Sequence, residues 1–555
     1  MLAACGSGGS SHVSSAPRTV TVNWVDTYWS PSGPVQAPEP AWAALNIEAL
    51  VPQKDGSITL LKASATSAPG VFTIANVPAG NYWLAAGNGG AFWTNTATFD
   101  AGSDIAGGQY PSASSQNTIS FNYDISGIAP ETTEEWIVSY FFPLSLVSQF
   151  SLDPGSTSLS DDFALPSSID WSEVHSEFLM QYELEPLGPL NNYVLGPELT
   201  LSNLTLTEGA TNSISGTLNP ATETSFNLGV SGSQWASVFN NVGPAMATVQ
   251  NSVLTLTAEP YVVGLNAGPS SVDLPALLLV APTPGGTALL YESNEIIIDP
   301  LVSICEDFTG APPGSVLVNE PPVLTDQNFG VLQYSDPFDP TWTRALALCQ
   351  QATVPIPIPN SSETYSFVLE DGASVAPSNS PLAPIALPVE NPAINGSSFF
   401  TASTADTVTP TLTWTAPTGA APYGYRIGVY LLITSSGLPA AEPIAIYNTA
   451  GTSVTLPPLN GGNTYIFTIT TEVDGAANMQ TSPYRSALPA GFASVVSAPI
   501  TISPSAATPQ IEGDIEEWRR LVTPKPHFQG QAQEQPRRHV SCSSLAGSQV
   551  RAYCE

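Results

Sequence analysis

The sequence predicts an all-β protein built from tandem antiparallel β-sandwiches. Short runs rich in Thr, Val and Leu alternate with Pro, Gly, Asn and Asp, the residues that end strands and form turns. No long amphipathic helix pattern interrupts them. With 555 residues, of which 42% are apolar and 10% charged, the chain is too long for a single core and too apolar for a disordered protein. We therefore expect roughly three to five domains.

Composition and strand spacing divide the chain into five predicted segments. They are a flexible Gly/Ser-rich start (1–16), a first β-sandwich (17–100), one or two further β-sandwiches (101–385), a later β-sandwich (386–505) and a disordered or out-of-pattern tail (506–555).

The first sandwich is indicated by two short patterns. Strict alternation predicts that Val20, Val22 and Trp24 share a buried face. The segment Gly70-Val-Phe-Thr-Ile-Ala-Asn-Val-Pro-Ala-Gly-Asn-Tyr-Trp-Leu84 predicts a strand, a Pro/Gly turn and a second strand. It resembles the signature of carboxypeptidase-regulatory-like (prealbumin-like) sandwich domains. Such bacterial domains usually serve as stalks or scaffolds, so the resemblance implies architecture rather than chemistry.

The segment 386–505 resembles a fibronectin type III domain, so the predicted sandwiches are of the immunoglobulin-like or fibronectin type III-like kind. The likeness rests on Thr409-Pro-Thr-Leu-Thr-Trp414 as a strand with a buried tryptophan, on Tyr425-Arg-Ile-Gly-Val-Tyr-Leu431 as the next strand, and on the leucine and tyrosine of Leu459-Asn-Gly-Gly-Asn-Thr-Tyr465. The resemblance implies a tyrosine corner at Tyr465. It also implies a spacer or binding module more often than an enzyme.

The tail departs from the β pattern. Six of the twelve basic residues follow residue 510, and a short helix is indicated around residues 514–521. Glu516 and Arg520 have the i, i+4 spacing of a helical ion pair. Our hypothesis is that the tail is disordered or reflects a reading-frame slip in the gene sequence.

The charge distribution excludes nucleic acid as a partner. The net charge is −34, and residues 63–343 contain no Lys or Arg, so this body cannot neutralise phosphates. Anionic membranes would repel it too. No apolar run approaches the about 18–20 residues of a spanning helix; the most apolar run, residues 274–281, predicts a buried strand.

The start of the chain resembles the lipobox of bacterial lipoproteins. Leu2-Ala-Ala-Cys5 ends in a cysteine and is followed by a Gly/Ser-rich tether. The resemblance implies lipidation of Cys5 and attachment to the membrane only through that lipid. Only four residues precede the cysteine, where the family has a basic and an apolar region. Either translation starts upstream of Met1, or the match is a coincidence of small residues.

Two cysteines lie in the body of the chain. In an exported protein Cys305 and Cys349 would form one disulfide, worth about 3–4 kcal/mol by loop entropy. The alternative is a pair of buried free thiols.

Motifs for catalysis are absent from the sequence. His175 is the one histidine between the tether and the tail, and no G-x-S-x-G, H-E-x-x-H, paired C-x-x-C or phosphate-binding glycine loop accompanies it. We predict a surface histidine, and neither catalytic residue, metal nor cofactor.

Aromatic residues form the one predicted ligand site. Five of eleven tryptophans lie within the first 93 residues. On the strand around Tyr82 and Leu84, Trp83 should point to the opposite face. With Trp29 and Trp93 it would form a flat aromatic platform for sugar rings; an interdomain contact is the alternative.

These observations predict a non-enzymatic exported protein that acts as a structural or adhesive scaffold on a bacterial surface or outer membrane, lipid-anchored or else secreted. The alternative is a carbohydrate-binding accessory protein that uses its N-terminal aromatics. The expected partner is a glycan or a surface protein.

Overall fold

The computed structural model describes most of the chain and confirms that it is mostly β, with 57% strand and 6% helix. The described residues are 17–30, 33–53, 55–86, 90–102, 104–106, 119–130, 135–142, 146–165, 176–187, 190–220, 223–262, 275–280, 324–335, 342–359, 361–419, 421–435, 438–475, 477–485 and 488–524. None of the helices in these ranges is long and apolar enough to cross a bilayer.

In the N-terminal part the described residues form short strands and a 3-10 helix. Its elements are β1 (Arg18–Asn23), β2 (Val25–Ser30), β3 (Gly33–Pro38), η1 (Ala41–Asn46), β4 (Ile47–Pro52), β5 (Ile58–Lys62), β6 (Ser64–Ala65), β7 (Val71–Val77), β8 (Tyr82–Ala86), β9 (Ala91–Thr94), β10 (Thr98–Asp100) and β11 (Asp104–Ala106).

Longer strands make up the middle part. They are β12 (Ile119–Ser126), β13 (Glu135–Phe142), β14 (Leu146–Leu152), β15 (Ser158–Leu165), β16 (Ser176–Leu187), β17 (Leu190–Ser202), β18 (Thr211–Thr217), β19 (Glu223–Val230), β20 (Thr248–Val262), β21 (Pro275–Val280), β22 (Gln327–Ser335), β23 (Trp342–Pro357) and β24 (Thr364–Val375). The short helix α1 (Gly232–Val238) also lies among the described residues of this part. Residues 275–280 of the apolar run form β21, which confirms the predicted strand; the burial of its side chains lies outside the described part of the structure.

The C-terminal part is again β and ends in a helix. Its elements are β25 (Glu390–Ile394), β26 (Ser397–Ser398), β27 (Ser403–Thr407), β28 (Thr411–Thr415), β29 (Gly424–Ser435), β30 (Leu438–Thr449), β31 (Ser453–Thr455), β32 (Thr464–Val473), β33 (Ala490–Val496), β34 (Ile500–Ala507), β35 (Ile511–Glu512) and α3 (Ile515–Val522).

Several strand patterns read from the sequence are confirmed. Val20 and Val22 are fully buried on β1, and Trp24 follows them inside. The predicted strand–turn–strand of residues 70–84 forms β7 and β8. In the C-terminal part, Trp414 on β28 packs against Tyr425 on β29, with ring centroids 5.1 Å apart.

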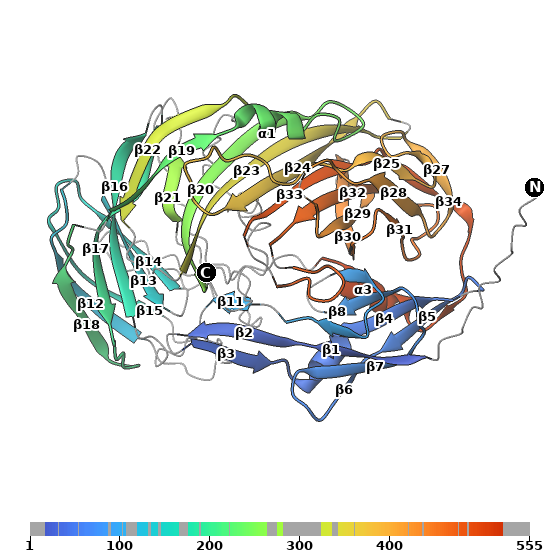
Figure 1. The fold of residues 1–555 in the computed structure, drawn as a ribbon, viewed down its shortest axis with the longest axis horizontal. Coiled ribbons are helices and arrows are strands. Elements are labelled where there is room, and N and C mark those ends of the chain that lie inside the picture. The colour runs from blue at the N-terminus through green and yellow to red at the C-terminus, as the bar shows by residue number, and fades with distance from the viewer. Residues whose placement is uncertain are drawn as a thin grey trace, which may run out of the picture.

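The first and last parts of the chain share one hydrogen-bonded sheet. Strand β9 pairs in parallel with β30, and the pairing continues on one side through β29 and β32 and on the other through β8, β4 and β5. Figure 1 shows the N-terminal strands (blue) beneath the C-terminal strands (orange to red), with the teal strands of the middle part at the left of the view. Exposed sheet edges can pair with other chains. The pairing of β9 with β30 covers one such edge on each strand.

The chain between β34 and the end of α3 completes this union, and we call residues 508–524 the C-terminal clasp. Its strand β35 pairs in parallel with β5, and α3 packs against β30 and β8. The short helix predicted around 514–521 is therefore present, but the prediction of a disordered tail is wrong for residues 506–524. The prediction relied on the polar, basic composition of the tail and did not take account of three buried residues of the helix, Trp518, Leu521 and Val522. Residues 525–555 lie outside the described ranges.

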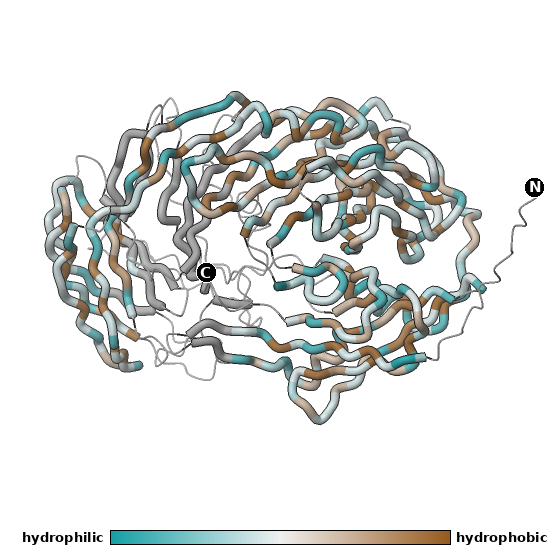
Figure 2. Tube along the Cα trace, in the orientation of Figure 1, coloured by the Kyte–Doolittle hydropathy of each residue, from teal (hydrophilic) through white to brown (hydrophobic). Residues whose placement is uncertain are grey.

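Strand β8 lies between two cores. Tyr82, Leu84 and Ala86 face the core of the N-terminal part, whereas Trp83 and Ala85 face a second core that contains strands of the C-terminal part and α3. The two-residue period thus places alternate side chains in different cores. Figure 2 shows hydrophobic residues recurring along the strands of both parts, with polar residues between them.

Hydrogen bonding also crosses the boundary expected near residue 385, because β24 pairs with β33. At the other end of the molecule, β12 and β18 on one sheet and β13 and β16 on another supply one common core.

Replacing Trp518, which is 0% exposed, tests the role of the clasp. Trp518→Ala should lower the free energy of unfolding by about 3–5 kcal/mol, because it leaves a large cavity between α3 and the shared sheet. Chemical denaturation followed by circular dichroism measures the change. Arg520→Ala, on the exposed side of the same helix, should change stability by less than about 0.5 kcal/mol. Equal effects of the two variants would contradict a packed clasp.

Candidate functional site at the junction

A pocket of about 630 Å³ opens where the N-terminal part, the C-terminal part and the clasp meet. Its walls come from β4, β5 and the turn between them, from Trp83 and Trp93, from residues 453–457 around β31, and from residues 507–509, where the clasp begins. The volume is within the range of small-molecule sites. Segments far apart in the sequence therefore build one concave surface.

Two of the three predicted platform residues meet at this pocket. The Trp83 and Trp93 ring centroids are 5.1 Å apart and their planes are tilted by 49°, and the Tyr447 ring of β30 lies 5.0 Å from that of Trp83. Trp83 is only 1% exposed, so it cannot offer a flat face to solvent. The predicted three-tryptophan platform is therefore wrong for Trp83, whose ring packs at the interdomain contact that was the alternative interpretation.

Trp93 remains partly accessible at the pocket wall. Trp29 lies on β2, in a separate sheet with β3 and β11. Its side chain lies outside the described part of the structure.

The described lining carries no charged side chain. Apolar walls are joined by a set of neutral polar residues, namely Gln53, Ser57, Thr409, Ser453, Thr455 and Thr508. Some of these are held by neighbours: the Gln53 amide donates to Thr59 Oγ1 at 3.2 Å, and the Thr455 and Thr411 hydroxyls lie 2.8 Å apart. The pocket therefore combines an aromatic wall with uncharged hydrogen-bonding groups.

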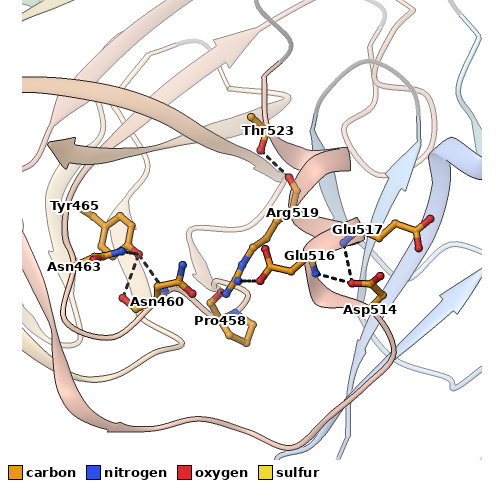
Figure 3. Close-up of polar contacts among 9 residues, drawn as sticks. All are labelled: Pro458, Asn460, Asn463, Tyr465, Asp514, Glu516, Glu517, Arg519 and Thr523. Carbon is orange, nitrogen blue, oxygen red and sulfur yellow. Dashed lines mark hydrogen bonds and ion pairs between the residues drawn. The ribbon is translucent and has the colours of Figure 1, made fainter. Parts of the chain in front are cut away.

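The clasp helix is capped and anchored beside this pocket. The Asp514 carboxylate accepts hydrogen bonds from the backbone amides of Glu516 and Glu517 at 3.1 and 3.2 Å, a typical N-cap. Arg519 pairs with Glu516 and donates to the Pro458 carbonyl at 3.3 Å, as Figure 3 shows. At the other end, Thr523 donates to the Ile444 carbonyl at 2.9 Å.

The adjoining turn is held by a tyrosine. The Asn460 amide donates to the Tyr465 hydroxyl at 3.0 Å, and that hydroxyl donates to the Asn460 carbonyl at 3.2 Å (Figure 3). This is the hydrogen bonding implied for Tyr465 by the resemblance. It fixes the loop that bears Pro458, to which α3 is attached.

A second set of contacts joins the two parts on the opposite face. Arg485 pairs with Asp100 at 3.1 Å and donates to the Val25 carbonyl at 3.0 Å. The Tyr484 hydroxyl donates to the Ala86 carbonyl at 2.9 Å. Met479 of the same loop is buried in the N-terminal core. The junction is therefore bonded on both faces of the shared sheet.

Glu48 is a buried acid under the clasp. It lies on β4, is 2% exposed, and neither carboxylate oxygen has a hydrogen-bond partner among the described residues. Burial, followed by the negative charge of Glu517, raises the pKa of Glu48 to about 7, while Lys62 opposes the shift. Lys62 pairs with Glu517 and lies opposite Glu48 in the β4–β5 register.

Two further buried acids lie away from the pocket. Glu177 on β16 accepts hydrogen bonds from Tyr123 at 2.6 Å and Ser139 at 2.5 Å, and burial raises its pKa to about 7. Burial also raises the pKa of Asp371 well above its usual range; it accepts from the Ser494 amide at 2.8 Å. Both are 0% exposed, so they act inside cores rather than on a ligand.

The other predicted site residues are mostly outside the described ranges. Cys5, Cys305 and His175 are among them. Cys349 on β23 is buried and disulfide-bonded; its pairing with Cys305 stays a prediction. Within the described residues, no group of three or more His, Cys, Asp or Glu side chains is placed to hold a metal ion.

Sequence reasoning missed Tyr447, Glu48 and the clasp. Tyr447 and Glu48 gave no local signal, since Trp83, which contacts Tyr447, and Glu517, whose charge acts on Glu48, lie hundreds of residues away from them. The clasp had one: Trp518, Leu521 and Val522 recur at helical spacing after a capping Asp514.

Comparison with known proteins identifies no family. No family model matches the chain, and neither does any curated protein. Among solved structures, a leucine-rich repeat protein from Bacteroides thetaiotaomicron matches at 10% identity over 36% of this chain and 27% of that protein, with a TM-score of 0.09. A similarity at that level does not define a fold or a function.

Glu48→Gln tests the cost of the buried acid. Because the folded pKa is above the value of about 4.5 expected when unfolded, the wild-type chain loses stability as pH rises from about 4.5 to about 7. The glutamine side chain of the Glu48→Gln variant does not ionise, so the variant does not lose this stability. We expect Glu48→Gln to be more stable than wild type by about 2 kcal/mol at pH 8 and equal near pH 4.

Denaturation at both pH values measures this difference. Glu442→Gln, at an exposed position on β30, is the control and should leave stability unchanged at both. A Glu48→Gln variant that is destabilised at pH 8 would show that the carboxylate is stabilising.

Proposed function

We propose that this protein is a non-enzymatic, exported scaffold that holds an adhesive or structural surface away from a bacterial membrane. The observation that carries the proposal is the junction itself. A shared sheet, the clasp and the Arg485–Asp100 contacts join the first and last parts into one bonded unit. Such a unit suits a spacer, because two parts that are bonded to each other keep a fixed relative position and do not flex at a linker.

The finer fold assignment is part of this proposal. We infer that the C-terminal part is a fibronectin type III-like sandwich. Strands β25, β26, β28 and β31 form one sheet, and β29, β30, β32 and β33 are hydrogen-bonded in another. The buried Trp414 and the hydrogen bonds of Tyr465 support the assignment.

The N-terminal part is proposed to be a carboxypeptidase-regulatory-like sandwich. Its support is the strand–turn–strand of β7 and β8 and a core with residues from β1, β4, β7 and β8. Both module types serve mainly as spacers, which agrees with the scaffold proposal.

Attachment is proposed through a lipid on Cys5. The net charge of −34 disfavours direct contact with anionic lipids, so a covalent anchor is the simplest means of holding this body at a membrane. A glycan or another surface protein is the proposed partner.

Fractionation of the native host tests location and attachment together. The wild-type protein should be recovered with membranes, be cleaved by protease added to intact cells, and carry a diacylglyceryl group on Cys5 by mass spectrometry. Cys5→Ser should leave the membrane fraction, because a lipid chain supplies the membrane affinity.

Two results would contradict the proposal. Protein that is free of membranes and carries an unmodified Cys5 would contradict the proposed lipid anchor. Recovery of the protein in the cytosol would contradict the proposed export. Release of products from a polysaccharide by the purified protein would refute the non-enzymatic function.

A further inference from the structure

We propose that the pocket at the junction binds a short, neutral saccharide, with Trp93 as the aromatic wall against which a sugar ring packs. This inference goes beyond the scaffold function and does not depend on it. It also differs from a flat three-tryptophan platform, because Trp83 is buried and the walls include residues from both ends of the chain.

The charge of the lining selects a neutral ligand. The described lining has no Asp, Glu, Lys, Arg or His, so a charged ligand would find no opposite charge among these residues. The protein's net charge of −34 further repels anions. Desolvating an unpaired ion in such a pocket would cost several kcal/mol.

The mixture of groups selects a ligand with one apolar and one polar side. Trp93, Pro52, Ala507 and Pro509 are accessible and offer apolar surface, while Gln53, Ser453 and Thr508 offer an amide and two hydroxyls. A purely apolar ligand would cover the Ser453 and Thr508 hydroxyls without offering them a hydrogen-bond partner. A pyranose matches both sides, since its C–H face is apolar and its hydroxyls point outward around the ring.

The position of the pocket gives binding a second consequence. Its walls belong to the N-terminal part, the region around β31, and the chain that enters the clasp. A ligand that contacts all three favours the closed junction over any state in which the clasp has left β5. Binding should therefore raise the melting temperature of the full chain.

The test uses the full chain with cellobiose, maltose, laminaribiose and N,N′-diacetylchitobiose, each at about 10 mM, which detects dissociation constants in the millimolar range. Isothermal titration calorimetry and thermal unfolding are the readouts. Trp93→Ala removes the aromatic wall. Ser453→Arg places a long side chain in the mouth of the pocket from an exposed position. If Trp93→Ala unfolds, Ser453→Arg still tests whether the saccharide binds in this pocket.

Two variants are matched controls. Trp42→Ala removes a tryptophan that is 63% exposed and lies outside the pocket. Ser397→Arg places the same new side chain on β26, at another exposed position of the sheet that contains β31.

We expect at least one saccharide to bind and to raise the melting temperature. Trp93→Ala and Ser453→Arg should each weaken binding by about tenfold or more, and the controls should bind like wild type. The proposal is overturned if no saccharide binds the wild-type chain, or if Ser453→Arg binds as tightly as Ser397→Arg. Binding of indole by the wild-type pocket, without any saccharide binding, would also overturn it.

Discussion

The parallel pairing of β9 with β30 is the contact on which the rest of the junction depends. It makes one sheet from strands that lie more than 340 residues apart in the sequence. Trp83 packs against Tyr447 beside that pairing, and α3 packs against β30 and against β8, the neighbour of β9. Because hydrogen bonds and apolar burial act at the same place, separating the two parts would expose a sheet edge and a core together.

This constraint accounts for the unusual placement of polar groups. The face of β4 that carries Leu50 also carries Glu48, and the clasp that buries the leucine must bury the acid as well. Burying an unpaired carboxylate opposes folding. The apolar burial of the surrounding core offsets this cost. The pocket arises from the same geometry, since three segments that converge from different directions leave a space between them.

Local patterns predicted much of the fold but little of the junction. The alternation at Val20 and Val22, the turn before β8 and the strand around Trp414 depend on neighbours in the sequence, so they could be read directly. The opposite faces of Trp83 and Tyr82 could also be inferred. The segment that packs on Trp83 could not be inferred. A two-residue period indicates that a strand has a second buried face, but it does not indicate which part of the chain covers that face. The clasp was misjudged for a similar reason: its polar composition outweighed the helical spacing of Trp518.

Native-state hydrogen exchange tests the interlocked junction most directly. If the first and last parts form one cooperative unit, amides of β4, β8 and β9 should open with the same free energy and the same denaturant dependence as those of β29 and β32. Exchange of the N-terminal strands at a clearly lower free energy, with β29 and β32 still protected, would show that the first part unfolds independently and would contradict the account.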